Sequence, residues 1–132
     1  MTGSDLTAAT GWLADTHAHL YSCFPIQQYF ESAIRNIDRV HGPGGGTGCL
    51  LVAETATDRS FSRLVESAPR TLPGGFTLHA TSEPTSFVVA AEAGTRLALI
   101  GGRQIVTAEG LEVLVFGGAA DDAADGRAAD AA

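Results

Sequence analysis

The chain contains no lysine, and this absence already limits what it binds. Its eight basic residues are all arginine, 15 acidic residues outnumber them, and the formal net charge is −7. Nucleic acids and anionic membranes are bound by clustered positive charge. The charge therefore argues against a general nucleic-acid-binding or membrane-binding surface, and we expect no nucleic-acid partner.

Cysteine is scarce as well, since only Cys23 and Cys49 are present and they form no C-x-x-C pair. Two cysteines are too few for a disulfide framework, so we expect reduced, partly buried thiols and a cytoplasmic location. A metal-ligand role for Cys23 stays open.

Long hydrophobic runs are also missing. The run Leu97–Ile100 is far shorter than the roughly 20 residues that a membrane helix needs. Residues 1–10 show neither the basic nor the apolar region of a targeting segment. We therefore expect no membrane partner.

What is present suits one domain with a core of its own. The chain has 132 residues, of which 45% are hydrophobic, and that length buries roughly two-thirds of the unfolded surface. We expect a loose leader at residues 1–11, a folded domain at 12–117 and a disordered acidic tail at 118–132, where no apolar residue is larger than alanine.

The first half of the domain alternates strand and helix. Trp12–Leu20 predicts a strand, and Pro25 suits the first turn of a helix that ends near Gly42. Apolar residues recur there at three- and four-residue steps, which indicates an amphipathic helix lying on a sheet; they are Ile26, Tyr29, Phe30, Ala33, Ile34, Ile37 and Val40.

A second strand and a shorter helix follow. The continuous apolar run Cys49–Ala53 is typical of a strand covered on both faces. Asp58 suits the start of a helix that Pro69 stops. The first half therefore predicts a strand–helix–strand–helix start with parallel strands.

The second half changes character. Residues 76–80, 85–91, 96–108 and 111–116 are strand-like, and short polar or glycine-containing connections separate them. Such spacing predicts antiparallel hairpins. The fold class is α/β, a strand–helix–strand–helix start followed by antiparallel hairpins.

The stretch Asp15-Thr16-His17-Ala18-His19 carries the clearest chemical signal. On a strand, alternate side chains face the same way, so the three polar side chains share a face and the two imidazoles converge. Paired imidazoles suit zinc, manganese or iron. Asp15 is a further ligand or a residue that orients a ring. Two half-exposed histidines with water as their partner remain the plain alternative.

This stretch resembles the first motif of metal-dependent hydrolases with barrel folds: PHP-type phosphoesterases, TatD-type nucleases and the amidohydrolase group. A second likeness favours the PHP type. The run Gly102–Gly117 is similar to a PHP hairpin that carries a ligand glutamate and a ligand histidine. Gln104 stands at the glutamate position and Glu112 at the histidine position.

The resemblance implies one metal site with altered ligands. In the PHP group a second strand ends in an Asp-His pair, and here that place holds Glu54 and Thr55. The expected metal ligands are His17, His19, Glu54 and Glu112, and Asp15 and Gln104 are expected to support them. Glutamine cannot bridge two cations as a carboxylate does, so we expect at most one weakly held zinc, manganese or iron ion. The catalytic residues stay unknown.

The resemblance covers the N-terminal half of such a barrel, and barrels of this kind usually run to about 200 residues or more. An unclosed half leaves an open sheet edge, so we expect either a second copy of the chain or a complementary C-terminal half as partner. Two functions follow: a truncated or degenerate metal-dependent hydrolase that cleaves phosphoester or related bonds, or a non-catalytic partner-binding domain with a vestigial metal site.

Overall fold

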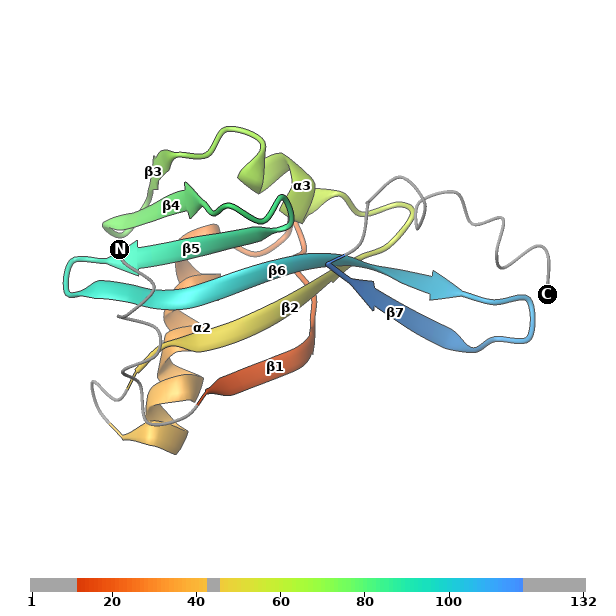
Figure 1. Ribbon diagram of the computed structural model, residues 1–132, viewed down its shortest axis with the longest axis horizontal. Helices are drawn as coiled ribbons and strands as arrows, with labels where there is room; N and C mark the ends of the chain where they lie inside the picture. The colour runs from red at the N-terminus through yellow and green to blue at the C-terminus, as the bar shows by residue number, and fades with distance from the viewer. Residues whose placement is uncertain (1–11, 43–45, 118–132) are drawn as a thin grey trace.

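A computed structural model describes residues 12–42 and 46–117 of the chain. These residues form one seven-stranded sheet with two helices, so the predicted α/β class is confirmed (Figure 1). The predicted leader at 1–11 and tail at 118–132 lie outside the described residues. The elements in chain order are β1 Leu13–Ala18, α2 Ile26–His41, β2 Gly48–Glu54, α3 Ser60–Val65, β3 Arg70–Leu72, β4 Phe76–Ala80, β5 Ser86–Ala91, β6 Gly94–Val106 and β7 Glu112–Phe116.

The sheet combines a parallel and an antiparallel half. Its strand order is β1-β2-β6-β5-β4-β3, and β7 pairs with β6 outside this path. The pairs β1–β2 and β2–β6 are parallel, whereas β3–β4, β4–β5, β5–β6 and β6–β7 are antiparallel. Both the predicted parallel start and the predicted hairpins are confirmed; the three-residue strand β3 was not predicted, because it is too short to show a pattern.

Helix α2 begins and ends where the sequence indicates. Pro25 is its N-cap residue, and Gly42 follows its last turn with a φ of 92°, a conformation that glycine adopts without strain. Phe30 and Ile37 are its buried residues and face the sheet. The three- and four-residue spacing of apolar side chains therefore fixes which face of α2 packs against the strands.

Helix α3 is shorter than expected, and its N-cap lies one residue after the predicted cap, Asp58. Arg59 occupies the N-cap position, and Asp58 Oδ1 accepts a hydrogen bond from the Ser60 backbone N–H at 2.9 Å. Its buried residues, Phe61 and Leu64, turn toward the sheet.

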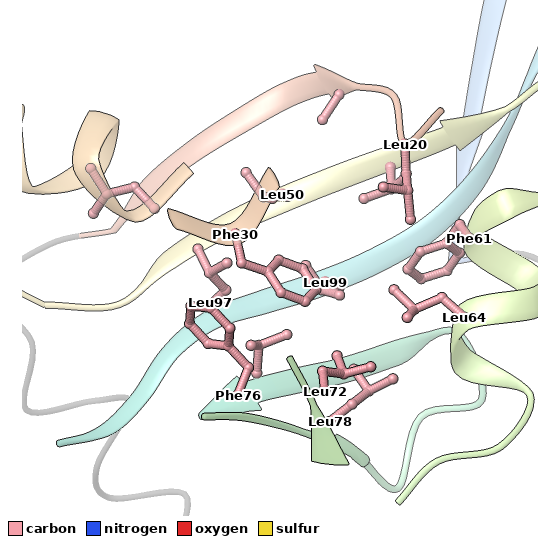
Figure 2. Close-up of a cluster of buried hydrophobic side chains, with 14 residues drawn as sticks. Leu20, Phe30, Leu50, Phe61, Leu64, Leu72, Phe76, Leu78, Leu97 and Leu99 are labelled. Carbon is pink, nitrogen blue, oxygen red and sulfur yellow. The ribbon is translucent and has the colours of Figure 1, made fainter. Parts of the chain in front are cut away.

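The hydrophobic core lies between the two helices and one face of the sheet (Figure 2). From β2 it takes Leu50 and Val52, and from β6 it takes Leu97 and Leu99. In the register of the two strands Gly48 pairs with Leu97, Leu50 with Leu99 and Val52 with Gly101, so the four core side chains project from one face. The alternate residues of β2, Cys49 and Ala53, are also buried, which explains its continuous apolar sequence.

Strand β6 is 13 residues long and links both halves of the sheet. It pairs with β5 through Gly94–Ile100, with β2 through Leu97–Arg103 and with β7 through Gly102–Val106. Figure 1 shows the β6–β7 hairpin extending beyond the rest of the sheet. This hairpin carries Gln104 and Glu112. No helix among the described residues is long and apolar enough to cross a membrane.

Candidate metal centre

His17 and His19 lie at the end of β1, where the strand departs from regular pairing. Asp15 pairs with Leu50 and Ala18 with Val52, so three steps along β1 match two along β2. This irregularity re-aims the side chains that follow it. The two imidazoles meet, with His17 Nε2 and His19 Nε2 3.0 Å apart.

The His19 ring is oriented by the neighbouring strand. Its Nδ1 lies 2.9 Å from the Ala53 carbonyl oxygen. A carbonyl only accepts hydrogen bonds, so Nδ1 carries the hydrogen and, in the neutral ring, Nε2 presents a lone pair. Tyr21 stacks on the same ring, with centroids 5.5 Å apart. A ring held in this way presents the lone pair of Nε2 to a hydrogen-bond donor or a cation.

Gln104 brings a third donor atom to the same point. Its Oε1 lies 3.0 Å from His17 Nε2, and its Nε2 donates to Glu112 Oε1 at 3.1 Å. A carboxylate accepts but does not donate, so this bond assigns the amide nitrogen to the Glu112 side and turns the amide oxygen toward His17.

Three atoms therefore converge: His17 Nε2, His19 Nε2 and Gln104 Oε1. His19 Nε2 and Gln104 Oε1 are hydrogen-bond acceptors, and each lies 3.0 Å from His17 Nε2. One electropositive centre satisfies them, either the Nε2 hydrogen of His17 or a cation bound by all three. Ligands about 2.0–2.1 Å from a common divalent ion lie roughly 3 Å apart, so this donor set fits one ion with two imidazoles and an amide oxygen.

Glu54 does not join this cluster. Residues of β2 alternate between faces, and Glu54 leaves from the face that bears Leu50 and Val52 and faces α3. There its carboxylate accepts from the Ser62 backbone N–H at 3.0 Å and from the Ser62 hydroxyl, with Arg59 at 3.8 Å. Glu54 is buried and holds the start of α3, which differs from its expected role as a ligand.

Glu112 and Asp15 also take positions other than the expected ones. The Glu112 carboxylate accepts a hydrogen bond from the Gln104 amide nitrogen and so orients the Gln104 side chain. Asp15 Oδ1 accepts from the His17 backbone N–H at 3.1 Å and so shapes the strand near His17. The described residues contain no group of three or more His, Cys, Asp or Glu side chains placed to hold a metal ion; the third donor found here is an amide. Cys23 is exposed and Cys49 buried, and both are free thiols.

Sequence reasoning did not find the Ala53 carbonyl, and it gave Gln104 only a supporting place. The carbonyl leaves no trace in side-chain identity, although the end of a strand beside the histidine strand is where such an acceptor is expected. The signal for Gln104 was the resemblance of Gly102–Gly117 to the PHP hairpin, in which Gln104 stands at the position of a ligand glutamate.

A groove of about 640 Å³ runs beside this cluster, between β1 and α2. One wall is formed by β1 and the residues after it, and the other by one flank of α2. Tyr29 on that flank lies near Asp15; burial, and then the negative charge of Asp15, raise its pKa to about 12. The residues lining the groove include Leu13, Asp15, His17, His19, Tyr21, Phe24, Gln28, Tyr29, Ser32, Asn36 and Val40.

Comparison with known proteins finds no matching family model, no similar curated protein and no similar solved structure. The functional argument therefore depends on the geometry of this chain.

Proposed function

We propose that this chain is a PHP-type, metal-dependent hydrolase domain that binds one divalent ion through His17, His19 and Gln104. The observation that carries the proposal is that His19 Nε2 and Gln104 Oε1 each lie 3.0 Å from His17 Nε2. The order of the elements supports it, because β1 and β2 bring the histidine pair beside the β6–β7 hairpin, as the resemblance to PHP-type hydrolases implies.

The supporting hydrogen bonds suit a ligand set. The Ala53 carbonyl fixes His19 with its Nε2 lone pair free, and the Glu112 carboxylate polarises the Gln104 amide toward its oxygen. Both contacts raise the electron density of the donor atoms, which strengthens their attraction for a cation.

The same three donor atoms limit the affinity of the site for divalent ions and the number of ions that it binds. All three are neutral, so the Coulomb attraction that a carboxylate ligand supplies is missing. A pair of ions about 3.5–4 Å apart needs anionic bridging, and Glu54 lies on the opposite face. The site therefore holds one ion, and holds it weakly.

A divalent ion at such a site polarises a phosphoryl or carbonyl oxygen and makes a water molecule more acidic. The residues of this chain bind and orient: the imidazoles and Gln104 supply the donor atoms, and Ala53 and Glu112 fix their directions. The single-ion site predicts little or no phosphoesterase turnover by this chain alone.

Calorimetric titration with zinc and manganese tests the proposal. The unmodified chain should bind one equivalent, and His17→Ala and His19→Ala should each weaken binding about tenfold or more. His79→Ala is the matched control, because His79 bonds to Thr77 on β4, away from the cluster. Binding that survives both β1 substitutions, no binding at millimolar metal, or two tightly bound ions would overturn the proposal.

A further inference from the structure

The groove beside β1 follows a strand that is hydrogen-bonded on one side only. Among the described residues, β1 ends the strand order and pairs with β2 alone, so within this part of the chain its other edge presents backbone N–H and C=O groups to no other strand. Ala14, Asp15, Thr16 and His17 are exposed along it. Such an edge is a template for one more strand.

The residues of α2 that line the groove are themselves neutral; these are Gln28, Tyr29, Ser32, Ala33, Asn36, Ile37 and Val40. The acidic residues and arginines of the helix, Glu31, Arg35, Asp38 and Arg39, are not among them, but the guanidinium of Arg35 donates to the Ser32 hydroxyl at 3.1 Å. Among the described residues that line the groove, Asp15 is the only acidic one and none is an arginine. In a chain with a net charge of −7, a second, equally charged chain meets little repulsion at such a surface.

The two ends of the groove carry exposed apolar side chains. Val40 lies at the C-terminal end of α2 and is 71% exposed, and Phe24, just before α2, is 54% exposed. Both line the groove. An antiparallel copy of the same helix would place Val40 of one chain near Phe24 of the other at both ends, so the surface complements itself.

We propose that a second copy of this chain occupies the groove, with β1 paired antiparallel to β1 of the second copy about a two-fold axis. Full overlap of the six-residue strand sets Leu13 opposite Ala18 and Ala14 opposite His17. It also sets Asp15 beside Thr16, so the two Asp15 carboxylates are not directly opposed.

The irregularity in β1 lets Leu13 and Ala18, the outermost pair of this overlap, face the same way. Directly opposed residues must face the same way. Leu13 and Ala18 both share the helix face through their register partners Gly48 and Val52. An uninterrupted six-residue strand would set them on opposite faces. The two α2 helices then lie on the same face of the joined sheet and meet along their neutral flanks.

This contact is isologous and closes on itself, so pairing through β1 by itself yields a dimer. The other end of the strand path, β3, is only three residues long and offers little for pairing. Because two negatively charged chains approach each other, added salt should strengthen the dimer by screening their repulsion.

The first test is sedimentation equilibrium over a range of concentrations, with the full chain and its Ser32→Glu and Ser82→Glu variants. The unmodified chain should reach twice its mass of 13.6 kDa. Ser32→Glu puts a carboxylate on the groove-lining flank of each copy and removes the hydroxyl that accepts from Arg35, and it should raise the dimer dissociation constant at least about tenfold. Ser82→Glu makes the same change in the exposed turn before β5 and should leave the constant unchanged.

The second test locates the contact by hydrogen exchange. Backbone amides of β1 should exchange more slowly as concentration rises, and those of β3 should not change. If Ser32→Glu loses its far-ultraviolet circular dichroism, Asn36→Glu, one turn along the same flank, replaces it. A monomer at millimolar concentration, a dimer indifferent to both helix variants, or protection confined to other strands would overturn the proposal.

Discussion

Gln104 and Glu112 are joined across the β6–β7 hairpin by a hydrogen bond of 3.1 Å from the amide nitrogen to the carboxylate. Gln104 pairs with Leu114, and Glu112 pairs with Val106 two residues further along β6, so both side chains project from one face of the hairpin. Because the amide nitrogen is engaged by Glu112, the amide oxygen faces His17. The hairpin thus presents a neutral oxygen where a carboxylate would attract a cation more strongly.

Exchanging these two residues should strengthen metal binding without loss of stability. Gln104→Glu supplies an anionic ligand but places two carboxylates side by side and removes the donor to Glu112. The double variant Gln104→Glu/Glu112→Gln keeps the new charge and restores a donor at position 112. We expect the double variant to bind manganese or zinc at least about tenfold more tightly, which is about 1.4 kcal/mol.

Calorimetry and metal-free thermal unfolding separate these effects. The single variant should melt several degrees lower than the unmodified chain, since roughly 1 kcal/mol shifts Tm by about 4–8 °C in a domain of this size. The double variant should melt at the original temperature. Equal affinity in the double variant and the unmodified chain would show that Gln104 is not a ligand.

Removal of the Glu54 side chain should destabilise the fold and leave metal affinity unchanged. Glu54→Ala leaves the Ser62 N–H and hydroxyl without their acceptor in a buried place, which costs about 1–3 kcal/mol. Urea unfolding and calorimetry measure the two quantities, and Glu66→Ala, at an exposed position, is the control. If the Glu54→Ala variant kept its normal stability and no longer bound metal, Glu54 would be a metal ligand.

Two glycines should differ in their tolerance of alanine. A Cβ at Gly102 would overlap the Val115 carbonyl oxygen and the Phe116 ring, whereas one at Gly48 would overlap only side-chain atoms, Cδ1 and Cγ1 of Ile37. Backbone cannot yield as a side-chain tip does, so Gly102→Ala should cost more than Gly48→Ala, within the roughly 1–3 kcal/mol typical of overpacking. Gly102→Ala should also weaken metal binding, because it disturbs the hairpin that holds Gln104. Similar losses in both variants would contradict this ranking.

Tyr29 should make the protein sensitive to alkali. Its pKa is raised from 10.0 to about 12, first by burial and then by Asp15. The folded chain therefore holds the phenolic proton more tightly than the unfolded chain. This contribution to stability is complete below pH 10 and is lost as pH rises toward 12.

The measurement is the urea midpoint between pH 9 and 12. Tyr29→Phe should flatten its decline, and Tyr21→Phe, at an exposed residue, should not. The chain has no lysine, so the side chain that usually titrates in this range does not contribute. A decline of equal slope in the Tyr29→Phe variant would rule out this origin.

Most of the elements follow from local sequence patterns. The apolar spacing between Ile26 and Val40 determined α2 and its buried face, and Pro25 and Gly42 marked its ends. The apolar run at Cys49–Ala53 and the short polar connections of the second half determined β2 and the hairpins. These signals are local, because the helical and strand periods are set by backbone geometry within a few residues.

The sequence also predicted that the His17 and His19 side chains meet, since they are two residues apart on a strand. Only the tertiary structure decided which other residues contact them. Gln104 contacts His17 from 87 residues away, and its partner depends on how β6 and β7 pair. Glu54 lies apart from His17, His19 and Gln104 because it projects from the face of β2 that packs against α3. A strand pattern shows only that side chains alternate between the two faces of a sheet. The register between strands far apart in the chain decides which face packs against the helices. It also decides which distant atoms meet on the opposite face.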